Sequence, residues 1–77
     1  MNSEISAAEK AKRIFAWNIR VERAKLRISQ EKLAEKAEIS RTFVGQIENC
    51  DSNMTINVMG AIADALDIPL EKLLTKN

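Results

Sequence analysis

Residues that begin helices recur at short intervals along this sequence, and this punctuation limits what the chain can fold into. Ser6, Ser29, Ser40 and Thr55 each stand directly before a segment whose apolar residues recur at helical spacing. A Ser or Thr side chain at such a position accepts a hydrogen bond from a free backbone N–H of the first helical turn. Pro69 opens a fifth segment, because its fixed φ suits a first helical turn. The sequence therefore predicts five helices joined by turns of a few residues.

The length and composition favour one all-α domain over residues 1–77. The chain has 77 residues, with two Gly, one Pro and no Tyr, and it is rich in good helix formers such as Ala, Leu, Glu and Lys. A domain of this size has a small core. We therefore predict a compact five-helix bundle, stabilised by close helix packing or by a partner subunit.

The first expected helix runs from Ser6 to about Lys25. Its predicted buried stripe consists of residues three or four apart, with Ile19 beside them: Ile14, Trp17, Val21 and Ala24. An indole on an amphipathic helix is usually part of the core, so we expect Trp17 to be buried.

Several classes of function lack the residues that they need. The chain contains one cysteine, Cys50, and no histidine, which excludes an internal disulfide framework, a zinc cluster and a Ser/His/Asp or Cys/His catalytic set. Glu48 is a carboxylate without catalytic partners. We expect no enzymatic activity, no metal, no cofactor, and an incidental loop position for Cys50.

The apolar runs fall short of the roughly 20 residues that a membrane span needs, and the N-terminus lacks a signal-peptide core. We therefore expect a cytoplasmic protein without a membrane partner. The net charge is only +1, but residues 1–49 hold ten Lys and Arg against seven Asp and Glu, whereas residues 50–77 hold two against four. A basic first part is compatible with phosphate binding, although a solvated helix face has the same composition.

The stretch Gln30–Glu48, QEKLAEKAEISRTFVGQIE, carries the clearest functional pattern. Two short helices joined by a short turn can cross steeply only where the residues at the crossing are small, and Ala34 is small. Ile39 is placed to fill the turn, while Val44 and Ile47 anchor the second helix from beneath. The outer face of the second helix is then free to enter a DNA major groove. This face contains Arg41, Thr42, Gly45 and Gln46.

The run SQEKLAEKAEISRTFVGQIEN resembles the helix-turn-helix of the Cro and phage-repressor (XRE-like) family, and MTINVMGAIADALDIPLEKLL looks like that family's fourth and fifth helices. The resemblance covers roughly residues 13–75. RTFVGQIE, the polar loop after it and the ALDI end of the fourth helix are also similar to controller proteins of bacterial restriction–modification systems. The resemblance implies a five-helix lambda-repressor-like fold with the helix-turn-helix at about residues 29–49.

The resemblance also implies roles for individual residues. Arg41, Thr42 and Gln46 match base-reading positions, since Arg pairs with guanine, Gln pairs with adenine, and the Thr methyl meets a thymine methyl. Arg23 and Glu48 match a partly buried salt bridge that ties the first helix to the recognition helix. Phosphate-contacting positions are matched at helix starts and in the loop after the recognition helix. They are Gln30, Ser40, Phe43, Asn49, Ser52 and Asn53.

Three residues depart from the family's pattern. Arg27, Glu38 and Cys50 stand where the family commonly has Gly, just after the first, second and third helices. Glycine suits such sites because many helices end with a left-handed residue. Each replacement costs about 1 kcal/mol if that geometry is kept; otherwise the turns differ. Phe43 also stands for a frequent Tyr, whose hydroxyl could reach a phosphate.

The segment of about residues 55–75 holds more apolar residues than one core-facing surface needs. A two-fold homodimer is the commonest use of such a surplus. It also fits DNA reading, because one short recognition helix contacts too few bases. We predict a dimer interface that contains Ile68, Leu70, Leu73 and Leu74.

Together these patterns predict a transcription regulator that binds double-stranded DNA as a homodimer on a two-fold operator, without a small-molecule ligand. Both repression and activation are compatible with such binding. An antitoxin-like protein-interaction module that also binds DNA is an alternative, but it would need a neutralising segment, and only MNSEISAAEKAK is spare. RNA binding is disfavoured because few aromatic residues are present to stack on bases.

Overall fold

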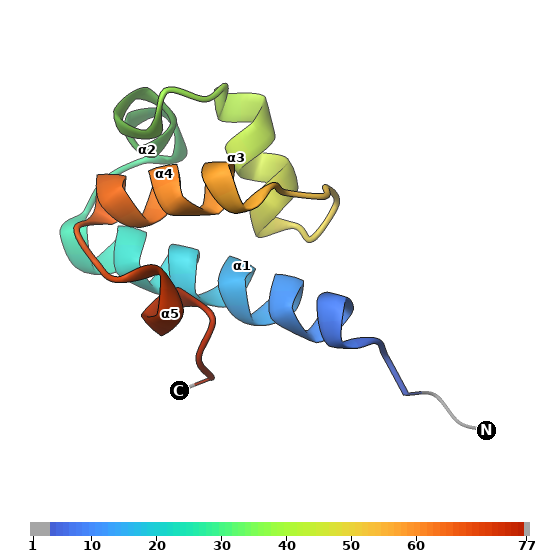
Figure 1. Ribbon diagram of the computed structural model, residues 1–77. Coiled ribbons are helices and arrows are strands. Elements are labelled where there is room, and N and C mark those ends of the chain that lie inside the picture. Colours follow the sequence, from blue (N-terminus) through green and yellow to red (C-terminus); the bar gives the residue numbers. More distant parts are fainter. Residues whose placement is uncertain (1–3, 77) are drawn as a thin grey trace.

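A computed structural model describes residues 4–76, and within this range the chain forms five helices (Figure 1). They are α1 (Ala7–Leu26), α2 (Gln30–Ala37), α3 (Arg41–Glu48), α4 (Ile56–Leu66) and α5 (Leu70–Leu73). In the view of Figure 1, α2, α3 and α4 lie above α1; α3 packs directly against α1, and α4 packs against α2. The short α5 packs against α1 and α4. The predicted all-helical, five-helix architecture is confirmed. None of the helices in this range is long and apolar enough to cross a membrane.

The first four helices begin at the residues that the sequence predicts. The side chains of Ser6, Ser29, Ser40 and Thr55 each accept a hydrogen bond from the backbone N–H three residues later, at 3.0 or 3.1 Å. These bonds satisfy N–H groups that have no partner within the helix. Pro69 directly precedes α5, with φ −60°, instead of lying within its first turn.

The hydrophobic core draws on all five helices, so each of them contributes to burying it. Its buried members are Phe15, Ile19, Leu33, Ala34, Ala37, Val44, Ile47, Ile62, Ala63, Leu66 and Leu73.

The predicted buried stripe of α1 is wrong for Trp17 and Ala24, whereas Ile19 is buried as predicted and Ile14 and Val21 are half-buried. Trp17 is 60% exposed and Ala24 is also exposed, whereas Phe15 and Ile19 are fully buried. Helical spacing fits two adjacent apolar stripes on α1 equally well. The packing of α3 and α5 on this helix selects the stripe of Phe15 and Ile19, and leaves the indole of Trp17 at the surface.

A buried amide on the same face of α1 holds α5 in place. The side chain of Asn18 is 3% exposed, and its Nδ2 lies 2.9 Å from the carbonyl oxygen of Leu73 and 3.0 Å from that of Thr75. Carbonyl groups at a helix C-terminus lack partners within the helix. The amide of Asn18 donates hydrogen bonds to these carbonyl groups. These bonds hold α5 in place, although a helix of this length is not stable by itself.

The structure corrects one of the predicted dimer-interface residues. Leu73 is fully buried in the monomer, because α5 turns it into the core. It therefore stabilises the fold and offers no surface to a partner. Ile68, Leu70 and Leu74 are only partly buried against the core, so part of each side chain remains at the surface.

The residues at the usual Gly positions keep the left-handed geometry. The backbone φ is 57° at Arg27, 60° at Glu38 and 61° at Cys50, and Asp67, after α4, joins them with 58°. In each case the following residue donates its N–H to the carbonyl five residues earlier, at 2.7–3.1 Å, which is the Schellman pattern. The turns therefore keep the geometry that glycine usually adopts at these positions. The chain retains the strain of four non-glycine residues in left-handed conformation.

Replacing Glu38 with glycine is therefore expected to raise the free energy of unfolding by about 0.5–1 kcal/mol, since it removes the left-handed strain. The same substitution at Glu35, inside α2, is expected to lower it by about 1 kcal/mol. Urea denaturation followed by circular dichroism compares the two variants. Equal destabilisation by both would contradict the strain at Glu38.

Candidate nucleic-acid interface

α2 and α3 form a helix-turn-helix around the small residue that the sequence indicated. Ala34 is buried, and its carbonyl accepts a 3.0 Å hydrogen bond from the N–H of Ile39 in the turn. The side chain of Ile39 packs against the core, and Val44 and Ile47 are buried beneath α3. The apolar side of α3 is thereby anchored, which leaves its opposite side facing outward.

The outward side of α3 carries the residues predicted to read bases. Arg41, Thr42 and Gln46 are all exposed, and Thr42 and Gln46 lie one helical turn apart. Within residues 4–76 no hydrogen bond or ion pair occupies any of these three side chains. Gly45 is half-buried beside Gln30. The face therefore offers a guanidinium, an amide and a hydroxyl to a ligand.

The residues predicted to contact phosphate differ in how accessible they are. Asn49 and Asn53 are exposed in or next to the loop after α3. Ser40 is exposed, but its hydroxyl already accepts the bond from the N–H of Phe43, which is half-buried against the core. The Oγ of Ser52 is buried and has no hydrogen-bond partner among the described residues, so a phosphate contact through it would require the loop to rearrange.

A buried carboxylate connects α1, α2 and α3. Glu48 is 4% exposed, and Arg23 of α1 donates to it from Nε at 2.8 Å and from Nη2 at 3.0 Å. This is a bidentate, charge-assisted pair. Arg20 donates from Nη2 to the backbone carbonyl of Glu48 at 3.0 Å. Arg20 is not among the residues predicted from the sequence, although it lies one turn before Arg23 on the same helix.

Gln30 completes this cluster. Its Nε2 donates to Oε1 of Glu48 at 3.0 Å, a contact that the sequence pattern does not predict. An amide nitrogen has two N–H groups, so one remains for the predicted phosphate contact. The cluster fixes α3 relative to α1 and α2, and thus sets the direction of the outward face.

The cluster also changes the ionisation of its members. Burial by itself raises the pKa of Glu48, but the hydrogen bonds from Arg23 and Gln30 outweigh it, so the pKa lies below the ordinary 4.5. The hydrogen bond to Glu48 raises the pKa of Arg23 above its ordinary value. Both groups are therefore charged in the folded protein at neutral pH.

The lowered pKa of Glu48 predicts a pH dependence of stability. The carboxylate stabilises the fold fully above the ordinary value of 4.5, and this stabilisation is lost as the pH falls through the lower folded pKa. Between about pH 5 and about pH 3 the native chain is expected to lose more stability than Glu48→Gln, whose amide does not titrate. Urea denaturation at both pH values measures this. Equal losses of stability in the native chain and in Glu48→Gln would show that Glu48 does not contribute to the pH dependence.

No group of three or more His, Cys, Asp or Glu side chains in the described range is arranged to hold a metal ion.

The second helix of the helix-turn-helix is anchored, and its polar outer face is unoccupied in the described range. Together these two features define the protein as a helix-turn-helix DNA-binding regulator.

A model of the helix-turn-helix family HTH_3 matches residues 19–73. The chain therefore belongs to this family, the XRE-like type that its motif resembles, whose members are DNA-binding regulators.

Individual proteins of known type are also similar to this chain. The chain is 38% identical, over 65 residues, to the control protein C.SmaI of Serratia marcescens, which covers 84% of this chain and 77% of that protein. The crystal structure of the restriction-modification controller protein C.AhdI from Aeromonas hydrophila is 31% identical, with a TM-score of 0.77, over 80% of this chain and 94% of that one. A hypothetical transcription factor, NHTF from Neisseria, is similar over 99% of this chain and 87% of its own, with 26% identity and a TM-score of 0.85.

Proposed function

We propose that this chain is a controller-type regulator of transcription, which binds a two-fold operator in double-stranded DNA as a homodimer. The observation that carries the proposal is the outward face of α3, where Arg41, Thr42 and Gln46 are exposed and engaged with nothing else in the described range. These side chains have the donors and acceptors that distinguish base pairs in the major groove. The Arg23–Glu48 pair holds that face in a fixed direction.

The controller role is supported by similarity. C.SmaI is a control protein and C.AhdI is a restriction-modification controller protein. Their likeness to this chain extends well beyond the helix-turn-helix, to 84% and 80% of its length. We therefore infer that this chain regulates transcription in a restriction–modification system.

A homodimer is needed because α3 has only eight residues, and one such helix reads too few bases for useful specificity. Two copies related by a two-fold axis read two half-sites about one DNA turn apart. The partly exposed Ile68, Leu70 and Leu74 are the apolar residues that we assign to the interface.

Selection from a random duplex library at near-physiological salt tests this proposal. We expect enrichment of a two-fold-symmetric motif with half-sites about one helical turn apart. Enrichment of an asymmetric single site would contradict the homodimer. Failure to enrich any sequence would contradict specific DNA binding.

Replacing Arg41 or Gln46 with alanine is expected to weaken operator binding by about 1–3 kcal/mol for each lost base contact, with much less effect on random DNA. Fluorescence anisotropy with both duplexes measures the two affinities. Lys25→Ala, which removes an exposed cation from α1, is the control and should not change the ratio of the affinities. Equal losses on both duplexes would exclude Arg41 and Gln46 as base readers.

A further inference from the structure

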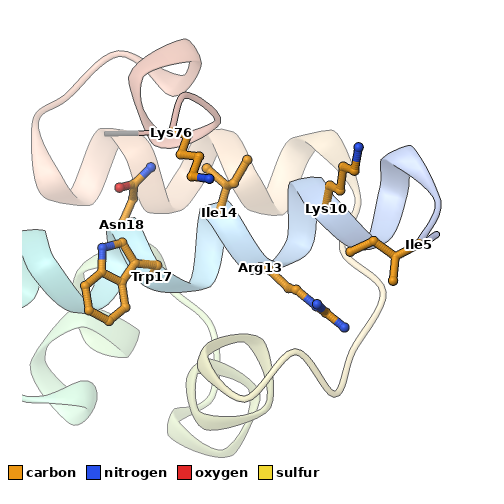
Figure 2. A pocket seen from close by; sticks show the side chains of 7 residues that line it. All are labelled: Ile5, Lys10, Arg13, Ile14, Trp17, Asn18 and Lys76. Carbon is orange, nitrogen blue, oxygen red and sulfur yellow. The ribbon is translucent and has the colours of Figure 1, made fainter. Parts of the chain in front are cut away.

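The surface of α1 has an open apolar groove around Trp17, the tryptophan that was predicted to be buried but is exposed. The groove has a volume of about 610 Å³ and lies where the chain after α5 passes α1. Its lining residues are Ile5, Lys10, Arg13, Ile14, Trp17, Asn18 and Lys76. Figure 2 shows Trp17 and Arg13 projecting on one side of α1, and Ile14, Asn18 and Lys10 on the other. Trp17 is 60% exposed, and it lines the groove together with Ile5 and Ile14, so three apolar side chains meet there.

The charged residues of the groove are all cations. Lys10, Arg13 and Lys76 line it together with the apolar side chains, and no Asp or Glu side chain among residues 4–76 does. None of these three cations forms an ion pair with a carboxylate in the described part of the chain. The chemistry of the groove therefore suits an occupant that is apolar and acidic.

The same chain presents such a surface at the corner between α4 and α5. Asp64 and Asp67 line a depression there together with Ile68 and Pro69, and Glu71 follows in α5. The three carboxylates are on exposed residues and form no ion pair within residues 4–76. We refer to Asp64–Glu71 as the acidic corner. It includes Ile68 and Leu70, which we assign to the dimer interface.

We propose that the groove around Trp17 receives the acidic corner of a second copy of this chain. This inference rests on the homodimer of the proposed function and specifies what the corner packs against. In a two-fold dimer the contact is made twice, because the groove of each copy meets the corner of the other, and the assembly closes. The indole and Ile14 become covered, and three cations meet three carboxylates.

Trp17 is the only tryptophan of the chain, so its fluorescence reports the groove directly. We expect its emission to shift to shorter wavelength as the protein concentration rises, with the same midpoint as dimer formation in sedimentation equilibrium. A dimer whose formation leaves the emission unchanged would refute the groove contact, while the homodimer of the proposed function would stand. A chain that stays monomeric at all concentrations, also on operator DNA, would refute both.

Charge reversal tests the pairing itself. Arg13→Glu and Asp64→Lys each place like charges at both contacts of their own homodimer, and each is expected to lower the association constant about ten-fold or more. An equimolar mixture of the two variants restores opposite charges at both contacts, so association is expected to return to near the native value. Lys36→Glu, an exposed position on α2, makes the same change in charge elsewhere and should have little effect.

The mixture also separates the outcomes. Recovery to the mass of a dimer supports the reciprocal contact, whereas longer oligomers would show a head-to-tail contact and overturn the two-fold arrangement. Reversal variants that dimerise as well as Lys36→Glu would overturn the role of the charges. Both substitutions are at exposed residues, and circular dichroism of each variant checks that it is folded.

Discussion

Replacing Glu48 with alanine is expected to lower the free energy of unfolding by about 3–5 kcal/mol, because it breaks a buried ion pair and leaves the other charge behind. Arg23 is only 22% exposed in its side chain, and it would keep its charge without the carboxylate that now accepts two hydrogen bonds from it. Gln30 would lose its bond to the same carboxylate. The whole free energy of unfolding of a small domain is about 5–15 kcal/mol. Urea denaturation should therefore show a large decrease in the midpoint concentration.

Two further variants establish the cause. Glu35→Ala removes a carboxylate whose ion pair with Lys32 is exposed, and such pairs contribute about 0–1 kcal/mol. The double variant Arg23→Met with Glu48→Leu removes both charges, and it is expected to be more stable than Glu48→Ala because no buried charge is left unpaired. A loss of less than about 1 kcal/mol for Glu48→Ala would show that the pair does not hold α3 in place.

The parts of the fold that depend on local interactions could be predicted from the sequence. Ser29 and Ser40 begin α2 and α3 because each satisfies an N–H three residues away. Ala34 and Val44 were placed correctly for a similar reason, since a helix-turn-helix brings its own two short helices together and the constraint lies within about 20 residues.

The parts that depend on distant packing could not be predicted. Whether Trp17 or Phe15 faces the core is decided by the packing of α3 and α5 on α1, and both helices lie far along the chain from these residues. The burial of Asn18 has the same origin, because its partners are backbone carbonyls near the C-terminus. Every residue has such a carbonyl, so the residue types do not indicate which ones Asn18 will bind.

The candidate site shows the same division. The exposed position of Arg41 follows from the periodicity of α3 itself. The bond of Gln30 to Glu48 does not follow from any local pattern, because it spans 18 residues and joins two helices. Family resemblance supplied the pairing of Arg23 with Glu48, but the contribution of Arg20 required the structure.

Replacing Leu73 with aspartate is expected to lower the free energy of unfolding by about 3–5 kcal/mol, since it removes a buried apolar side chain and places a charge in the core. Leu73 is 0% exposed, and its carbonyl accepts the hydrogen bond from Asn18. The sequence alone places Leu73 in the predicted dimer interface, which would imply an effect on dimerisation. The burial of this side chain instead predicts a large decrease in Tm and loss of helical signal.

Leu74→Asp is the matched comparison, because the neighbouring side chain is only partly buried. It should weaken the dimer with a much smaller decrease in Tm, so circular dichroism and sedimentation together separate the two residues. A Leu73→Asp variant that keeps its Tm but becomes monomeric would mean that α5 packs on the partner and not on its own α1. In that case the contact between Asn18 and α5 would itself join two chains, and the core of each subunit would be completed only by dimerisation.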